Sequence, residues 1–448
     1  MKEFCHTGIR SRKFIPLFIV IMFFSFHAGA QTNLNFCFDK NPQQNNDIVI
    51  DRSVKYNNET GYGFDIENVD SAKIINSSEA ETGYCTAGVP FYFSAKVPEG
   101  TYEVIITFGA PDHDSETTVK AEARRLMLFQ IKVPKGKTRT ESITVNVRSP
   151  KIDDTREINR KSRELNYMNW DNRLSLEFSG KYPAIQRVQI KHKEKFTTVF
   201  LAGNSTVTDQ DCAPWASWGQ MITRFFDNTI SVANYAESGA TMSSFKARGR
   251  LDKVLSLMKP GDYLFIEFGH NDQKEHGEGI GPWDSFTGYL KEFVSRAREK
   301  GGIPVLITPT QRRSFNDEGK IEYTHGDYPA AMRKVSEEMN VPLIDLNEKT
   351  KIMYEAWGPE ASRKAFVQYP ANTFPGQTEK LEDNTHFNTF GANEIAQCIL
   401  QGIIDNKLPL ANQIINFDAP YNPAHPSTFN DWKLIMSPRF VSKKPEGN

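Results

Sequence analysis

The residues of this sequence best suited to covalent chemistry are a serine, a histidine and an aspartate that lie far apart along the chain. Ser205 follows a short apolar run, rich in β-branched residues, that stops at Gly203, and a helical pattern resumes near Pro214. A serine just beyond a buried strand lies in the crevice where open α/β sheets bind their ligands. Asp383 and His386 supply the carboxylate and the base that an attacking serine requires.

Two further segments could complete such a site. Gly239 and Asn271 follow the second and third predicted strands of the same half of the chain. With the Ser205 N–H, the Gly239 N–H and the Asn271 amide could donate hydrogen bonds to an oxyanion, the charge that develops during acyl transfer. The spacing of Asp383 and His386 predicts one helix-like turn that brings the carboxylate to the imidazole.

The elements that must position these residues alternate between strand and helix after residue 196. Apolar strand patterns lie at 197–202, 230–235, 263–268, 303–308 and 341–346. Helical patterns lie at 215–226, 251–258, 283–300, 328–339 and 388–404. This alternation predicts an α/β fold with a five-stranded parallel sheet and helices on both faces. Segments that follow parallel strands reach one edge of the sheet, so the candidate residues can converge there.

The rest of the chain has a different character. Residues 31–195 contain short alternating runs between turn clusters, which predicts an all-β sandwich domain. The charged stretch 151–167 is interpreted as a surface loop, and residues 406–448, rich in Pro and Asn, as an irregular tail. The predicted organisation is therefore a leader over 1–30, a β-domain over 31–195, a catalytic domain over 196–405 and a tail over 406–448.

The first 30 residues are typical of a secretory signal peptide. A basic start precedes an apolar stretch of 13 residues and the small-residue sequence Ala28-Gly-Ala30. The alternative is an uncleaved anchor, which the short apolar stretch disfavours. We expect a secreted or periplasmic protein with no membrane span after cleavage. The net charge of −1, without a basic stripe, argues against a nucleic-acid partner, and a monomer is expected.

The cysteines leave two alternatives open. Cys37, Cys85, Cys212 and Cys398 follow the leader and are too few and too scattered for a disulfide scaffold or a zinc ribbon. Export permits the pairs Cys37–Cys85 and Cys212–Cys398, each within one predicted domain. Buried free thiols fit the sequence equally well.

No metal or organic cofactor is expected. His270 and its acidic neighbours do not match a zinc signature, and no phosphate-binding loop or dinucleotide fingerprint occurs. Trp215, His270 and His325 are candidate substrate contacts: Trp215 follows the predicted nucleophile, His270 precedes Asn271, and His325 lies just before a predicted helix, where it could reach the edge of a substrate. Their alternatives are core packing for Trp215, a structural role for His270 and a helix start for His325.

Taken together, these blocks resemble the SGNH (GDSL-like) hydrolase superfamily, and most closely bacterial rhamnogalacturonan acetylesterases with an N-terminal galactose-binding-like β-domain. The resemblance rests on Phe200-Leu-Ala-Gly-Asn-Ser-Thr-Val, Tyr235-Ala-Glu-Ser-Gly, the run from Lys259 through Gly-His-Asn-Asp, and Asp383-Asn-Thr-His-Phe-Asn. It implies a flavodoxin-like three-layer catalytic domain, Ser205 as nucleophile, Asp383 and His386 as its triad partners, and Ser205, Gly239 and Asn271 as the oxyanion hole. Asn204 departs from the Asp that the family usually has before the nucleophile.

The resemblance also implies a function. We expect an exported esterase that removes O-acetyl groups from rhamnogalacturonan, a pectin backbone polymer, with an acetylated polysaccharide or oligosaccharide as its partner. One alternative is the deacetylation of another glycan, such as xylan or peptidoglycan. The other is a glycan-binding protein that does not hydrolyse its ligand. The β-domain and Asn204 keep this alternative open.

Overall fold

A computed structural model describes residues 1, 33–39, 46–75 and 83–446. Residues 2–30 of the predicted signal peptide lie outside the described residues. The chain divides into two units, Met1–Gln31 and Thr32–Asn448, and the elements below belong to the second. Within the described ranges, no helix is both long and apolar enough to cross a membrane.

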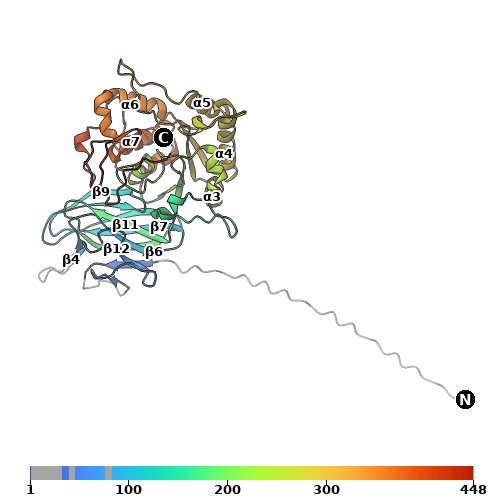
Figure 1. The fold of residues 1–448 in the computed structure, drawn as a ribbon. Helices are drawn as coiled ribbons and strands as arrows, with labels where there is room; N and C mark the ends of the chain where they lie inside the picture. The colour runs from blue at the N-terminus through green and yellow to red at the C-terminus, as the bar shows by residue number, and fades with distance from the viewer. Residues whose placement is uncertain (2–32, 40–45, 76–82, 447–448) are drawn as a thin grey trace. The chain divides into compact units, whose positions relative to one another are not determined.

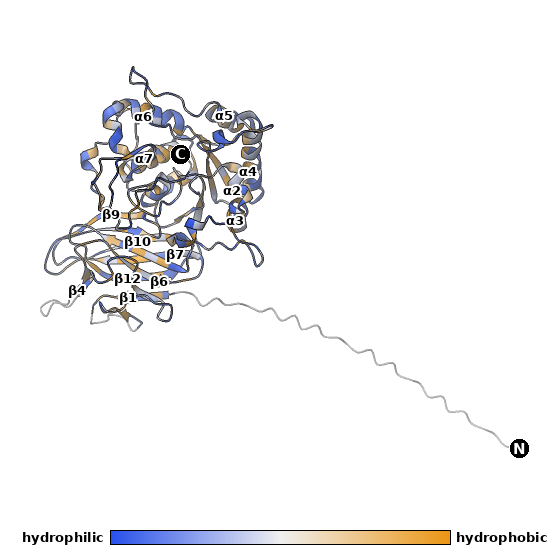
Figure 2. Cartoon of the chain, viewed as in Figure 1, coloured by the Kyte–Doolittle hydropathy of each residue, from blue (hydrophilic) through white to orange (hydrophobic). Residues whose placement is uncertain are grey.

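The first half of this unit is β-rich, as the alternating sequence pattern predicts. Strands β10-β7-β12-β1-β2 are neighbours in one sheet, which β4 and β5 extend, and strands β3-β6-β11-β8-β9 form a second sheet. Apolar side chains from both sheets meet in one buried cluster, and Figure 2 shows hydrophobic residues concentrated along these strands. The strands are β1 (Asn33–Cys37), β2 (Ile48–Val49), β3 (Tyr62–Asp65), β4 (Lys73–Ile75), β5 (Tyr84–Thr86), β6 (Phe91–Lys96), β7 (Gly100–Phe108), β8 (Ser115–Ala121), β9 (Arg125–Val133), β10 (Arg139–Val147), β11 (Arg173–Ser179) and β12 (Ile185–His192).

The second half contains the predicted sheet of five parallel strands, in the order β14-β13-β15-β16-β17. Numbered along the chain, this order is 2-1-3-4-5, so the direction of winding reverses between β13 and β15, where doubly wound sheets bind ligands. The last strand is shorter than its predicted range, because Pro342 lacks an N–H and Asp345 already caps the next helix. The strands are β13 (Thr197–Gly203), β14 (Ile230–Asn234), β15 (Tyr263–Glu267), β16 (Ile303–Ile307) and β17 (Leu343–Ile344).

Successive side chains of these strands enter two different apolar clusters. Val199 and Leu201 pack with α1, α6 and α7, whereas Phe200 and Ala202 pack with α2, α3, α4 and α5. Both faces of the parallel sheet are therefore buried, which explains the continuous apolar runs in the sequence. The helices are α1 (Trp218–Met221), α2 (Met242–Ala247), α3 (Arg250–Leu257), α4 (Thr287–Glu299), α5 (Tyr328–Met339), α6 (Leu346–Ala361) and α7 (Thr389–Asp405).

Three features of this half differ from the sequence prediction. The predicted helix 215–226 is a short α1 followed by the 3-10 helix η3 (Ile222–Phe225), and α2 and α6 lie outside every predicted helix. Asp383 and His386 lie on a strand, β19 (Leu381–Phe387), which pairs with β18 (Phe366–Tyr369). The helix-like turn predicted between them is therefore wrong.

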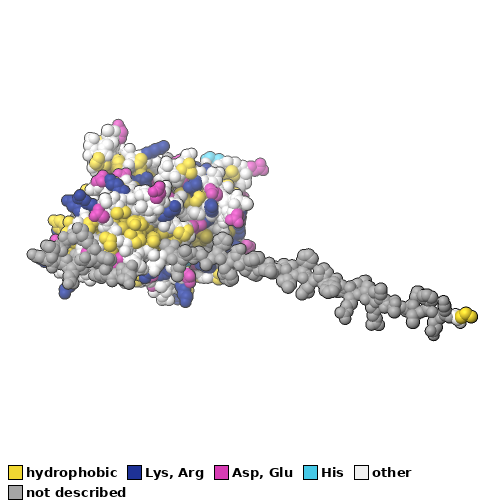
Figure 3. All heavy atoms as spheres, turned by 90° about the horizontal axis from the view of Figure 1, so that it is seen from below, with side chains coloured by type: hydrophobic (Ala, Val, Ile, Leu, Met, Phe, Trp, Pro, Cys, Tyr) yellow, Lys and Arg dark blue, Asp and Glu magenta, His cyan; other side chains and the backbone are white. Residues whose placement is uncertain are grey.

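The two halves meet along β9, which is labelled in Figure 1 between the blue-green strands and the orange helices. Leu126 of β9 belongs to the same apolar cluster as α1 and α7. On the face seen in Figure 3, basic and acidic side chains are interspersed around a band of apolar ones. All four cysteines after the leader are free thiols, and neither of the two disulfides considered from the sequence, Cys37–Cys85 and Cys212–Cys398, is formed.

Candidate active site

Ser205 lies on the tight turn that leaves β13. A Cβ atom on Gly203 would lie 2.5 Å from Val207 Cγ2 and 2.9 Å from the Glu267 carbonyl oxygen, so only glycine permits this close return of the chain. The Ser205 side chain is 3% exposed. Its position at the carboxyl end of β13, beside the reversal point of the sheet, is the one that the sequence predicts.

A chain of hydrogen bonds joins the three candidate catalytic residues. Ser205 Oγ lies 2.7 Å from His386 Nε2, and His386 Nδ1 lies 2.8 Å from Asp383 Oδ2. The ring of Trp215 stands edge-on to the imidazole, with 5.9 Å between the ring centroids. With its proton on Nδ1, the imidazole donates to Asp383 and accepts the Ser205 hydroxyl, which is the arrangement a general base requires.

The local folding of β19 fixes the Asp383 carboxylate. Its Oδ1 accepts hydrogen bonds from the backbone N–H groups of Thr385, at 2.7 Å, and His386, at 2.9 Å. Burial acts to raise the pKa of Asp383, but the hydrogen bond and charge of His386 and these N–H donors outweigh it, so the pKa lies below its usual value. The lowered pKa favours the ionised form of the carboxylate.

The candidate oxyanion donors come from three neighbouring strand ends. Gly239, after β14, has φ +76°, a conformation that favours glycine. The Asn271 amide, after β15, donates from Nδ2 to the Ala240 carbonyl at 3.1 Å, which holds it against the Gly239 loop. Among the described residues, the N–H groups of Ser205 and Gly239 have no protein acceptor, so both are available to a bound anion.

The three candidate substrate contacts are all largely buried. Trp215 lies on the wall of a cavity of about 280 Å³ beside the Ser205 loop. His270 and His325 stack edge-on, with their ring centroids 4.5 Å apart. Burial and the charge of Arg312 lower the pKa of His325 to about 3, and burial likewise holds the pKa of His270 far below its usual value. Both rings are therefore neutral near pH 7.

Sequence reasoning missed a polar cluster directly beneath the nucleophile. Thr206 Oγ1 lies 2.9 Å from Asn204 Oδ1 and 2.7 Å from Glu267 Oε1, and Trp218 Nε1 donates to the other oxygen of Glu267. Burial raises the pKa of Glu267 to about 7. The signal that could have found Glu267 is its place as the single acid in an otherwise apolar strand that is buried on both faces.

Sequence reasoning also missed a basic pair beside the nucleophile. Lys161 and Arg163, from the stretch interpreted as a surface loop, both donate to the carbonyl oxygen of Ser238 at 2.8 Å. No periodicity or motif marks them, because their partners are more than 70 positions away in sequence.

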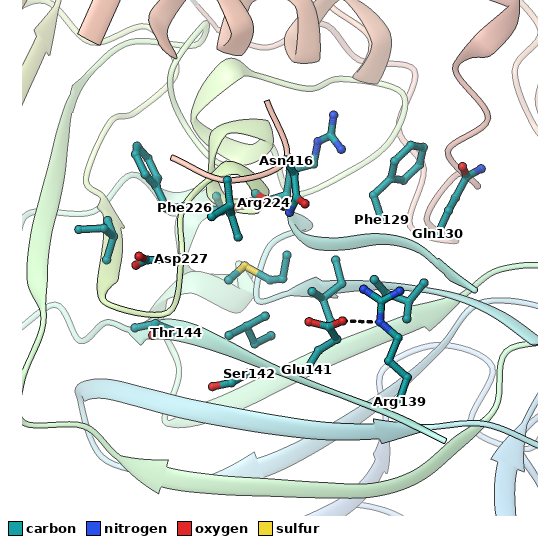
Figure 4. A pocket seen from close by; sticks show the side chains of 17 residues that line it. Phe129, Gln130, Arg139, Glu141, Ser142, Thr144, Arg224, Phe226, Asp227 and Asn416 are labelled. Carbon is teal, nitrogen blue, oxygen red and sulfur yellow. Dashed lines mark hydrogen bonds and ion pairs between the residues drawn. The ribbon is translucent and has the colours of Figure 1, made fainter. Parts of the chain in front are cut away.

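Another cavity, of about 330 Å³, lies between β9, β10 and η3 (Figure 4). Arg139 and Glu141 pair on its wall, and none of the candidate site residues lines it. No cluster of three or more His, Cys, Asp or Glu side chains suited to a metal ion occurs in the described part of the chain.

The chain is similar in sequence to known hydrolases. Residues 201–392 match the model of the GDSL-like Lipase/Acylhydrolase family. Rhamnogalacturonan acetylesterase RhgT of Bacillus subtilis (strain 168) is 45% identical over 222 residues, which are 49% of this chain and 94% of that protein. Probable rhamnogalacturonan acetylesterase YesY of the same organism is 36% identical over 220 residues, 48% of this chain and 97% of that protein. Uncharacterized esterase YxiM, also from that organism, is 25% identical over 369 residues, 79% of this chain and 86% of that protein.

The parallel sheet and these similarities together define an ester hydrolase. The chain belongs to the GDSL-like lipase/acylhydrolase (SGNH) family.

Proposed function

We propose that the protein is a carbohydrate esterase that removes O-acetyl groups through an acyl-enzyme intermediate. One observation carries the proposal: continuous hydrogen bonds of 2.7 and 2.8 Å link the Ser205 hydroxyl, the His386 imidazole and the Asp383 carboxylate. Triad chemistry requires a nucleophile, a base and a group that orients the base, in hydrogen-bond contact. The available N–H groups of Ser205 and Gly239 and the amide of Asn271 support the proposed oxyanion hole.

In the first half-reaction, Ser205 Oγ attacks the acetyl carbonyl carbon while His386 Nε2 takes the hydroxyl proton. The carbonyl oxygen becomes an oxyanion, which accepts hydrogen bonds from Ser205 N–H, Gly239 N–H and Asn271 Nδ2. The bond to the sugar oxygen then breaks, and His386 returns the proton to that oxygen, which leaves as an alcohol. Asp383 holds the imidazole and stabilises its charged form throughout.

In the second half-reaction, water takes the place of the departed sugar. His386 accepts one of its protons, the water oxygen attacks the acetyl carbon, and the bond to Ser205 Oγ breaks. The serine recovers its proton from His386, and acetate is released. No cofactor takes part in the proposed reaction.

The proposed substrate is acetylated rhamnogalacturonan. The similarity to RhgT and YesY, whose names state this activity, supports it. The wall position of Trp215 supports its role as a sugar contact, whereas the contacts proposed for His270 and His325 stay predictions, because both rings are buried. Acetylated xylan or peptidoglycan would fit the same chemistry.

Hydrolysis of p-nitrophenyl acetate tests the mechanism. We expect Ser205→Ala to lower kcat by about 10⁴-fold or more, because a triad works as a unit. Circular dichroism checks that the variant is folded. Equal rates in the two proteins would leave only the binding function. Acetate release from a panel of acetylated polysaccharides then tests the substrate, and a preference for xylan over rhamnogalacturonan would overturn that part alone.

We further propose that the chain is exported with a cleaved leader over residues 1–30, and that it acts as a monomer in the periplasm or outside the cell. The proposed domain division is a galactose-binding-like β-sandwich over 31–195, a three-layer hydrolase domain of flavodoxin-like type over 196–405, and a tail over 406–448. A mature N-terminus at Gln31, found by N-terminal sequencing of the exported protein, would support the leader.

A further inference from the structure

The end of the chain crosses the candidate active site. The segment 437–446, here called the C-terminal strap, is anchored by an ion pair of 2.7 Å between Arg439 and Asp211 and by a backbone hydrogen bond from Val441 to Ala213. The Val441 carbonyl then accepts from Trp215 Nε1 at 3.0 Å. Further along the strap, Lys444 Nζ lies 3.6 Å from the Asp383 carboxylate. The strap therefore follows the wall of the site toward the nucleophile.

The strap delivers a carboxylate to the basic pair. Glu446 Oε2 lies 2.8 Å from Lys161 Nζ, and its other oxygen pairs with Arg163 Nη1. Partial burial acts to raise the pKa of Glu446, but the hydrogen bonds and charges of Lys161 and Arg163 outweigh it and hold the pKa below its usual value. The Glu446 side chain is 57% exposed, whereas those of Lys161 and Arg163 are 19% and 25% exposed. The cations thus belong to the wall, and the carboxylate covers them from the solvent side.

This carboxylate lies next to the proposed oxyanion hole. A Cβ atom built on Gly239 would lie 3.2 Å from Glu446 Cβ and 3.3 Å from Lys161 Nζ. The hydrogen bonds of Lys161 and Arg163 to the Ser238 carbonyl fix both cations to the same loop. The cavity of about 280 Å³ is lined by Arg163, Trp215 and Ser238 together with strap residues. An anionic group in this position would thus be part of a ligand that also reaches Ser205.

Without Glu446 of the strap, the positive charges of Lys161 and Arg163 are only partly neutralised. Arg163 also pairs with the buried carboxylate of Glu237, so one of the two cations has a partner in the wall. In the described part of the chain, Glu446 is the only carboxylate that forms an ion pair with Lys161. If Glu446 moves away, one positive charge is left beside the nucleophile. Such a charge binds an anion more tightly than it binds a neutral group of the same shape.

We propose that Lys161 and Arg163 form a subsite for the carboxylate of a uronic acid unit next to the acetylated sugar, and that Glu446 occupies this subsite as an internal competitor. The inference rests on the proposed esterase function and names the feature of the substrate that the β-rich half recognises. It assigns the selection of an acidic glycan to the start of a 3-10 helix (Ser162–Asn166) between β10 and β11, outside the segment that matches the hydrolase family.

Competition by two monosaccharides tests the subsite. D-galacturonate and D-galactose differ at carbon 6, where one carries a carboxylate and the other a hydroxymethyl group. We expect galacturonate to inhibit p-nitrophenyl acetate hydrolysis with an inhibition constant about tenfold lower than that of galactose, because charge-assisted hydrogen bonds are the stronger ones. Equal inhibition constants would overturn the proposal.

Three variants assign the effect to these residues. Lys161→Gln should raise the galacturonate inhibition constant about tenfold, whereas Glu446→Gln should lower it several-fold, because the internal competitor loses its charge. Lys291→Gln is the matched control, since Lys291 also pairs with a glutamate at 2.8 Å but lies on α4, and it should change nothing. An unchanged constant in both Lys161→Gln and Glu446→Gln contradicts the proposal. Glu446 is exposed, so its replacement tests the subsite even if Lys161→Gln misfolds.

Calorimetric titration of galacturonate into the Ser205→Ala variant separates the two proposals. Binding that requires Lys161 supports the subsite whether or not the protein turns over esters. If Ser205→Ala leaves hydrolysis unchanged but galacturonate still binds more tightly than galactose, the esterase function fails and the subsite stands. If hydrolysis depends on Ser205 but the two sugars bind alike, the subsite fails and the esterase function stands.

Discussion

Asn204, the residue before the nucleophile, belongs to a buried hydrogen-bond network, and the number of donors and acceptors in it indicates whether Glu267 is protonated. Thr206 Oγ1 has one hydrogen but contacts two acceptors, Asn204 Oδ1 and a Glu267 oxygen. Both contacts are hydrogen bonds only if Glu267 carries a proton that it donates to Thr206. Burial raises the pKa of Glu267 to about 7, which favours the protonated form below that pH. The amide in place of the family's Asp thus leaves one titratable group, not two, beneath the nucleophile.

Asn204→Asp should keep activity but make stability more dependent on pH. The Asn204 Nδ2 atom has no partner among the described residues, so its loss removes no contact, and kcat should stay within about tenfold of wild type. The new carboxylate is buried close to Glu267, which raises its pKa in the folded state. When the pKa of a carboxyl is higher in the folded protein than in the unfolded one, its protonated form favours folding at low pH. This contribution to stability is lost as the pH rises through the folded-state pKa. The melting temperature should therefore fall, relative to wild type, between pH 5 and pH 8.

Thermal unfolding at the two pH values and kcat on p-nitrophenyl acetate check this prediction. Asn372→Asp is the control, because Asn372 is exposed. Its replacement should change the melting temperature by the same amount, relative to wild type, at both pH values. A loss of kcat as large as that of Ser205→Ala, or an offset for Asn204→Asp that does not change with pH, would contradict it.

At the scale of elements, the strap shows where sequence patterns stop being informative. The strands of the parallel sheet are predicted well, because burial on both faces produces apolar runs. Residues 406–446 have no such run, and scattered side chains such as Phe429 and Trp432 pack them on the core together with isolated polar contacts. Ser437, for example, bonds to Lys120 on β8 at 2.8 Å and to Glu177 on β11 at 3.0 Å. Contacts between residues about 300 positions apart leave no local pattern to read.

Helix α6 and the pairing of β18 with β19, which the sequence analysis missed, have separate physical causes. Helix α6 includes Gly358, with a non-helical φ of 75°, followed by Pro359, so its pattern is interrupted near the end. Asp383 and His386 are three positions apart, which fits a helical turn, but pairing of β19 with β18 decides the backbone there. The contact between the two residues was predicted from their types, and its geometry was not predictable from their spacing.

Lys120→Met tests whether the buried ion pair at the foot of the strap stabilises the fold. Lys120 Nζ lies 2.8 Å from Glu177 Oε1, and both side chains are at most 2% exposed. Removal of the lysine leaves a buried carboxylate without its cation, which costs about 3–5 kcal/mol of unfolding free energy. Urea unfolding measures the loss. Lys132→Met, at an exposed pair with Glu116, is the control and should have little effect. Equal losses of unfolding free energy in the two variants would mean that the buried pair stabilises the fold no more than the exposed pair does.

At the scale of the whole molecule, the β-rich half holds the segment that follows the nucleophile. Arg148 Nη2 lies 2.8 Å from Asp209 Oδ2, and Arg125 Nε lies 3.7 Å from the same oxygen. Arg124 donates to the carbonyl of Trp215 at 2.8 Å. The alignments with RhgT and YesY cover about half of this chain, and the family model matches residues 201–392. In this chain, three arginines outside that half contact the loop between Ser205 and α1.

Asp209→Asn should therefore weaken the whole unit and not one half of it. Asparagine keeps the shape but removes the charge that faces two buried arginines, and a buried charge left without its partner costs about 3–5 kcal/mol. Differential scanning calorimetry of the full chain should give one unfolding transition for wild type and one, at lower temperature, for the variant, because the lost contact joins the halves. Asp252→Asn, at a surface pair with Arg296, should shift the transition little. Two separate transitions, with the β-rich half unfolding at an unchanged temperature, would mean that the halves fold independently and that these arginines do not support the nucleophile loop.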